Sequence, residues 1–94
     1  MVLPAIRREE WAIYYVYFYN DLIKKAGYDP QKALLHVVLS TCEGTRQYEG
    51  VPEEVWYILR SKHTPEQYFR RHICGKYRET VLHKDGSLTV VHDI

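Results

Sequence analysis

The stretch that decides the fold is YEGVPEEVWYIL at residues 48–59, followed by TPEQYFRRHICGKY at residues 64–77. Pro52 stands at a first helical position, and two glutamates follow it in the first turn, where the helix dipole favours acidic groups. Apolar side chains then recur at helical spacing: Val51, Val55, Ile58 and Leu59. These features predict a helix over about residues 52–61.

The second piece carries its own helix signals. Thr64 is an N-cap residue with Gln67 three positions further on, which predicts a capping box. The apolar face of this segment consists of Tyr68, Phe69, His72 and Ile73. Gly75 provides a stop, because glycine adopts the left-handed conformation that ends many helices. We therefore expect a second helix over residues 65–75.

Strand patterns precede and follow the two helices. Residues 34–40 (LLHVVLS) and 45–49 read as strands joined by the turn at 40–44, which makes a hairpin. Residues 79–83 and 87–92 flank Lys84-Asp85-Gly86, a turn whose glycine supplies a positive φ, and predict a second hairpin. This C-terminal hairpin extends or caps the sheet.

Residues 11–19 (WAIYYVYFY) are rich in β-branched and aromatic side chains and favour a strand over a helix. Both alternating faces are apolar, so the strand is either covered on both sides or leaves aromatic surface free for a partner. Asn20-Asp21 resembles a helix cap, Leu22 to Ala26 a short helical turn and Gly27 its stop. The predicted fold class is α+β: a small antiparallel sheet with two consecutive helices packed on it and an extra C-terminal hairpin.

Length and composition limit the possibilities further. The chain has 94 residues, a mass of 11.2 kDa and a net charge of +1, which predicts a single domain over residues 1–94. Its longest apolar run has nine residues, too few to cross a membrane as a helix. The N-terminus has charged residues where a signal peptide is apolar, so we expect a cytoplasmic protein. Cys42 and Cys74 form no C-x-x-C pair and are predicted to be free, buried thiols.

From about Tyr17 to Tyr77 the sequence resembles the KTSC domain, a module found at the C-terminus of some lysyl-tRNA synthetases and as a stand-alone small protein. The matching residues are Ile23, Gly27-Tyr28-Asp29-Pro30, Leu35, Val37, Tyr48-Glu49-Gly50-Val51-Pro52, Val55, Trp56, Leu59, Thr64, Tyr68-Phe69, Ile73 and Tyr77. The sequence departs from the family pattern at Arg46, Glu66 and Arg70. The attachment to a tRNA synthetase implies RNA binding.

Charge is unevenly distributed along the chain, and this observation does not depend on the family resemblance. Residues 60–78 hold a single acidic residue, Glu66, beside a basic set: Arg60, Lys62, Arg70, Arg71, Lys76 and Arg78. Basic side chains next to exposed aromatic rings neutralise phosphates and stack bases in proteins that bind single-stranded nucleic acid. Tyr68 and Tyr77 are the main stacking candidates, with Tyr57 a third. The alternative is a solvated basic face with tyrosines that bury their rings and keep their hydroxyls wet.

The sequence also bears on three other classes of function. The histidines and cysteines show no pair spacing typical of a structural zinc site, so we expect no metal or other cofactor. Motifs of common catalytic sites are missing, and we expect a protein that is not an enzyme. The tyrosine-rich segment and the last hairpin create sheet edges that can pair with a second copy or another protein. A homodimer, or an oligomeric adaptor or inhibitor of another protein, is therefore the alternative to RNA or single-stranded nucleic acid binding.

Overall fold

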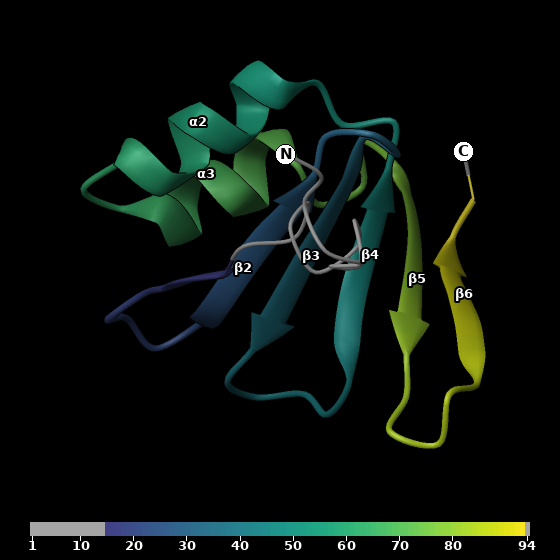
Figure 1. The fold of residues 1–94 in the computed structure, drawn as a ribbon. Helices are drawn as coiled ribbons and strands as arrows, with labels where there is room; N and C mark the ends of the chain where they lie inside the picture. Colours follow the sequence, from purple (N-terminus) through teal and green to yellow (C-terminus); the bar gives the residue numbers. More distant parts are fainter. Residues whose placement is uncertain (1–14, 94) are drawn as a thin grey trace, which may run out of the picture.

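The structure, a computed structural model, describes residues 15–93 (Figure 1). The strands and helices follow one another as β1 (Tyr15–Tyr17), β2 (Ile23–Asp29), β3 (Leu34–Leu39), β4 (Thr45–Glu49), α2 (Glu53–Ser61), α3 (Pro65–His72), β5 (Arg78–Leu82) and β6 (Leu88–His92). Both helices lie between β4 and β5 in the chain and form a helical hairpin.

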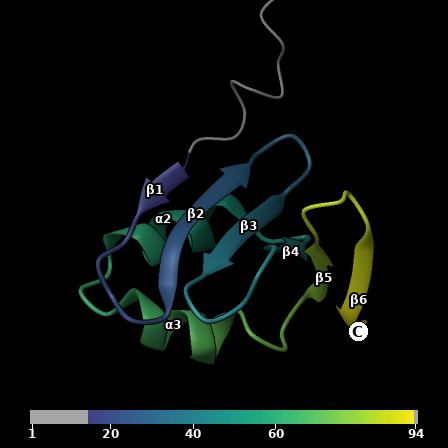
Figure 2. The ribbon, with the colours of Figure 1, turned by 90° about the horizontal axis from the view of Figure 1, so that it is seen from below.

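The six strands form one antiparallel sheet in which spatial order equals chain order, β1 to β6. Even β4 and β5, which the helical hairpin separates in sequence, are direct neighbours, with Tyr48 opposite Glu79. Both helices cover the same face of this sheet, as the end-on view shows (Figure 2). The other face, which we call the open face, is turned to the viewer in Figure 1. It carries the side chains of the alternate strand residues.

The core fills the space between the sheet and the helical hairpin. One buried cluster holds the strand residues Ala26, Tyr28, Leu35, Val37 and Tyr48, the helix residues Trp56, Leu59 and Phe69, and Ile73 directly after α3. Aromatic rings join the layers in two places. The ring of Tyr28 stacks on Trp56 with centroids 6.4 Å apart, and the ring of Tyr48 meets Phe69 edge to face at 5.7 Å. Each helix thus makes one aromatic contact with the sheet, α2 through Trp56 and α3 through Phe69.

Two polar contacts strengthen this core. The Tyr28 hydroxyl donates a buried hydrogen bond of 2.6 Å to the carbonyl of Val51, the residue that leads into α2. The Arg46 guanidinium, on the helix-covered side of β4, forms an ion pair with Glu79 on β5, whose side chain is only 7% exposed. Arg46, one of the positions at which the sequence departs from the family pattern, therefore forms a charge pair between neighbouring strands.

The prediction for the segment after Asn20 was wrong, and the observed structure of this segment adds a strand to the sheet. Residues 22–26 were expected to form a helical turn ended by Gly27, but residues 23–29 form β2, which lies between β1 and β3. Asn20 does act as a local cap, because its side-chain oxygen accepts hydrogen bonds from the backbone N–H groups of Leu22 and Ile23. This turn leads into a strand rather than a helix, so the sheet has six strands and is not small.

Other boundaries differ in detail. The strand predicted over residues 11–19 is confirmed over Tyr15–Tyr17, and the observed strand ends before Phe18. Residues 11–14 of the prediction lie outside the described part of the chain. Helix α3 ends at His72, and Gly75 adopts its positive φ of 74° in the following turn. The capping box is wrong: the Thr64 side chain makes no cap hydrogen bond, and the backbone N–H of Gln67 bonds to the Thr64 carbonyl instead. The C-terminal hairpin is confirmed and extends the sheet.

Candidate functional site

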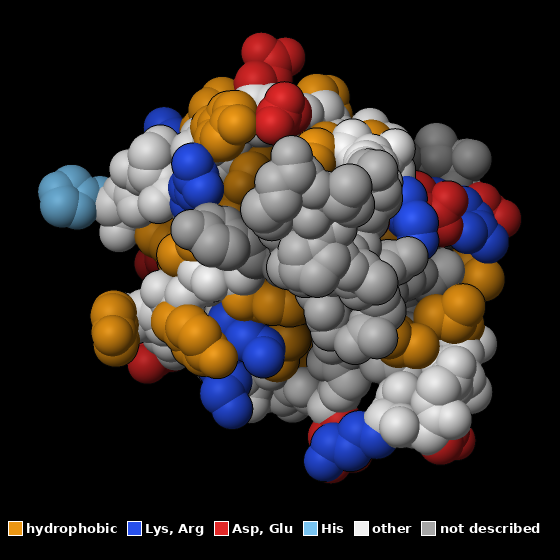
Figure 3. All heavy atoms as spheres, in the orientation of Figure 1, with side chains coloured by type: hydrophobic (Ala, Val, Ile, Leu, Met, Phe, Trp, Pro, Cys, Tyr) orange, Lys and Arg blue, Asp and Glu red, His pale blue; other side chains and the backbone are white. Residues whose placement is uncertain are grey.

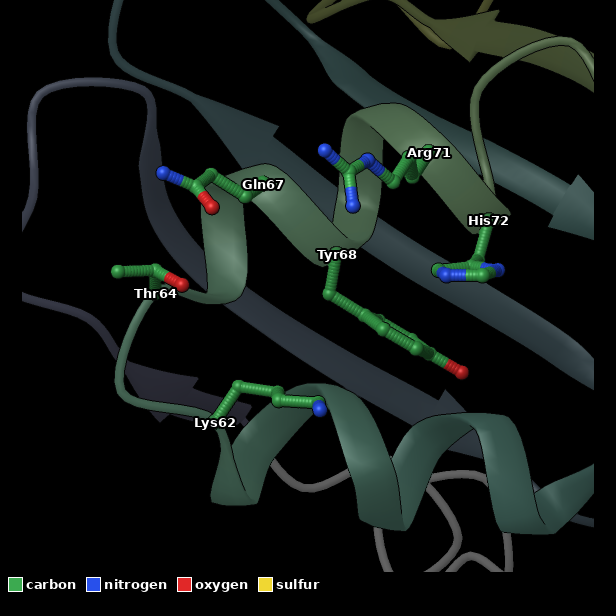
Figure 4. A pocket seen from close by; sticks show the side chains of 6 residues that line it. All are labelled: Lys62, Thr64, Gln67, Tyr68, Arg71 and His72. Atoms are coloured by element: carbon green, nitrogen blue, oxygen red, sulfur yellow. The ribbon is translucent and has the colours of Figure 1, made fainter.

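A small cavity of about 120 Å³ lies where the loop after α2 meets α3 (Figure 4). It is lined by Lys62, Thr64, Gln67, Tyr68, Arg71 and His72. Residues three and four apart share one side of a helix, which explains why Gln67 and Arg71, and likewise Tyr68 and His72, are neighbours here. Three members of the predicted basic and aromatic set, Lys62, Tyr68 and Arg71, therefore converge.

The helix that carries the cavity is amphipathic. Pro65 occupies the first position of α3, where its missing N–H costs no hydrogen bond, and Phe69 points into the core with 1% of its surface exposed. Arg71 lies on the opposite, solvent-exposed side, and Lys62 enters from the end of α2. Burial of one helix stripe thus leaves two cations on the same outer rim.

Two rings form the aromatic wall of the cavity. The Tyr68 ring and the His72 imidazole lie 4.7 Å apart between centroids, with planes inclined by 32°, and the Lys62 ammonium lies 5.7 Å from the Tyr68 ring centre. Figure 4 shows the Tyr68 ring extending from α3 toward α2, with His72 beside it. Partial burial raises the pKa of the Tyr68 hydroxyl, and Tyr77 and Glu54 raise it further, so the hydroxyl stays protonated and can donate.

The remaining predicted residues lie apart from this cavity. The Arg60 guanidinium, on α2, is 4.9 Å from the Tyr57 ring centre and 5.5 Å from that of Trp56. Arg70 is exposed on α3, next to Arg71 but about 100° around the helix. Lys76 is exposed in the turn after α3, and Tyr77 is half-buried against the core.

Arg78 belongs to a different surface. It lies on β5 opposite Glu49, and its guanidinium bonds to the Glu49 carboxylate at 2.5 Å and to that of Asp93 at 3.2 Å. With two acidic partners, Arg78 has its charge neutralised locally. Of the predicted phosphate contacts it is the least available, and only the strand register, which pairs Arg78 with Glu49, could have revealed this.

Sulfur and imidazole groups are dispersed. Both cysteines are free, but the prediction of buried thiols is wrong for Cys42, which is exposed, while Cys74 is half-buried. His83 is 2.8 Å from the hydroxyl of Thr89 on β6. Over residues 15–93, no group of three or more His, Cys, Asp or Glu side chains is arranged to hold a metal ion. Within the same range, no helix is long and apolar enough to span a membrane.

A six-stranded antiparallel meander with a helical hairpin on one face defines a small α+β domain. The family model of the KTSC domain matches residues 20–77, and the chain belongs to this family. A crystal structure of a KTSC domain protein from Yersinia pestis is similar, with a TM-score of 0.70 and 28% sequence identity. The similarity covers 74% of this chain and 97% of that one. A search of curated proteins gives no match.

The family match includes the cavity between the helices but ends before β5 and β6. Residues 78–92, which form the last hairpin, and β1 therefore flank the matched region. Chemically, the cavity offers two cations, a neutral hydroxyl and a pair of rings at a polar surface. Such a set can hold one anionic group and place a flat ring beside it.

Proposed function

We propose that this KTSC domain is a non-enzymatic module that binds RNA or other single-stranded nucleic acid through the cavity between α2 and α3. Lys62 and Arg71 contact phosphate oxygens, and a base stacks against the Tyr68–His72 ring pair. The observation that carries the proposal is the convergence of these four side chains around one cavity. A cavity of about 120 Å³ suits a phosphate group, so the base lies at its open side.

The surrounding charges support the same assignment. Arg60 and Arg70 extend the positive surface along α2 and α3, and both are exposed. The only acidic residue of the 60–78 segment, Glu66, does not line the cavity. A single nucleic-acid strand that follows this surface therefore meets several cations in succession, as proteins that bind single strands require.

The proposal is tested by fluorescence anisotropy with a labelled single-stranded RNA and a matched DNA at two salt concentrations. Two phosphate contacts predict about sevenfold weaker binding when salt rises from about 50 to 200 mM. The double variant Lys62→Ala/Arg71→Ala is expected to lose affinity and the part of the salt dependence that these two contacts contribute. Lys32→Ala, an exposed lysine in the β2–β3 turn, is the matched control. Equal affinity of the double variant and the control would refute the site. The ratio of the affinities for RNA and DNA identifies the preferred nucleic acid.

A second candidate function, pairing with a second copy or another protein, is favoured by the edge strand β6. All five of its residues are exposed, including Leu88, Val90 and Val91, and none is Lys, Arg, Asp, Glu or Pro, the residues that protect sheet edges. At the other edge, β1 exposes Tyr17. Light scattering after size exclusion tests this directly: a dimer that Val90→Lys converts to a monomer supports edge pairing, and a monomer at all concentrations excludes a homodimer.

A further inference from the structure

A second and larger hollow lies on the open face of the sheet, opposite the helices. Its volume is about 410 Å³, within the range of small-molecule sites. It is lined by Tyr17, Lys24, Lys25, Val38, Gly44, Thr45, Leu82, His83 and Lys84. These residues come from five neighbouring strands and two turns, at the end of the sheet where β3 and β5 finish and β4 begins (Figure 1). We call this hollow the sheet groove.

The floor of the sheet groove is apolar. Val38 lies opposite Lys25 in the β2–β3 register, and Leu82 lies opposite Thr45 in the β4–β5 register, so both side chains point to the open face. Gly44 has no side chain, and a Cβ there would lie 2.8 Å from the Leu82 carbonyl oxygen. The close approach of the β3–β4 turn to β5 thus requires glycine at this position.

The rim is cationic and is partly held in place. The Lys25 ammonium lies 4.8 Å from the centre of the Tyr15 ring and 5.7 Å from that of Tyr17, which fixes it between two aromatic side chains. Tyr17 itself is 61% exposed, so much of its side chain is accessible to a ligand. Figure 3 shows Lys or Arg side chains against hydrophobic ones at the lower left of this face.

Among residues 15–93, no acidic residue lines the sheet groove, but two lie nearby. Glu43 and Asp85 line an adjoining hollow that shares Gly44, His83 and Lys84 with it. The Asp85 carboxylate already accepts hydrogen bonds from the backbone N–H and the hydroxyl of Ser87, at 2.9 and 2.6 Å. Three lysines therefore face an apolar floor without a carboxylate among the lining residues.

We propose that the sheet groove binds a small aromatic anion, a flat apolar ring that carries one phosphate or carboxylate group. The ring packs over the apolar floor beside the exposed ring of Tyr17, and the anionic group contacts the Lys25 ammonium, with Lys84 adding attraction from the far rim. Both halves of the ligand are required, because exposed lysines alone attract anions only weakly and an open apolar floor alone holds little. This site lies on the face of the sheet opposite the proposed nucleic-acid surface.

The test is a two-dimensional amide NMR titration of the full chain with phenyl phosphate and, separately, benzoate. The expected result is saturable shifts at Lys25, Gly44, Thr45 and Leu82, with the tighter ligand identifying the head group. Inorganic phosphate and phenol, each carrying half of the ligand, are expected to bind at least about tenfold more weakly. Shifts that do not saturate, or that inorganic phosphate reproduces, would overturn the proposal.

Two variants and one control separate this site from general charge effects. Lys25→Gln is expected to weaken binding about tenfold, the value of a charge-assisted contact. Because that change also removes contacts with two tyrosine rings, Lys84→Gln in the exposed β5–β6 turn provides a second test, and it is expected to weaken binding by a smaller factor because it removes only charge from the far rim. Lys32→Gln, at the opposite end of the sheet, is expected to bind normally. Shifts confined to Tyr68 and His72 would place the anion in the cavity between α2 and α3. They would refute the sheet-groove proposal but not the proposed function.

Discussion

Replacing Tyr28 with phenylalanine tests how the helical hairpin is fixed to the sheet. The change removes one oxygen, and with it the 2.6 Å hydrogen bond to the Val51 carbonyl, while the ring can keep its stacking on Trp56. Val51 is fully buried, so its carbonyl cannot recover a partner from bulk water. Leaving a buried acceptor unpaired costs about 1–3 kcal/mol, and we expect a loss of about 1.5 kcal/mol in the free energy of unfolding.

The assay is urea denaturation followed by far-ultraviolet circular dichroism. A loss of this size lowers the transition midpoint by about 1 M urea and the melting temperature by roughly 10 °C for a domain of this length. Tyr17→Phe, in which the changed side chain is 61% exposed, is the matched control and should leave the midpoint unchanged. If Tyr28→Phe has the same transition midpoint as this control, the hydroxyl does not anchor α2 and the reasoning is refuted.

Three further predictions concern charge and backbone. Burial lowers the pKa of His36 below its ordinary value of 6.5, so the unfolded chain binds more protons near that pH, and stability should fall as pH drops below about 6.5; a His36→Gln variant that shows the same loss would contradict this. Arg46→Met leaves Glu79 buried without its ion-pair partner and should cost about 3 kcal/mol by urea denaturation, with partial recovery in Arg46→Met/Glu79→Gln; no recovery would argue against the pair. Gly44→Ala should destabilise the fold more than Gly86→Ala, since both have positive φ but only the first would place a Cβ 2.8 Å from a backbone oxygen; equal thermal shifts would count against that contact.

Local sequence signals predicted most of the fold. The β3–β4 hairpin, both helices and the β5–β6 hairpin follow from hydrophobic periodicity and turn residues, and all are confirmed. Strand β2 was missed because its sequence, IKKAGYD, lacks clean alternation, and a register shift between Ile23 and Lys25 interrupts the period of two. Its strand conformation depends on β1 and β3 on either side, which no local pattern records.

The candidate sites show the same division. Charge along the chain indicated the 60–78 segment, and helical spacing was enough to bring Tyr68 and Arg71 to one region. Arg78 was placed in that group because its strand partner was unknown. The sheet groove could not be predicted, since Tyr17, Lys25 and Leu82 come together only through the order and register of the strands.

The strand order has a consequence for how the chain folds. Because each strand pairs with its neighbour in sequence, most sheet contacts join segments that are close along the chain, and β4–β5 is the one pairing among the described strands that must close over a helical hairpin. Such local topology lowers the entropy lost in the folding transition state and is typical of domains that fold within milliseconds. We expect the β2–β4 meander to be able to form during translation, before β5 leaves the ribosome, with docking of the two helices and closure by β5 completing the domain.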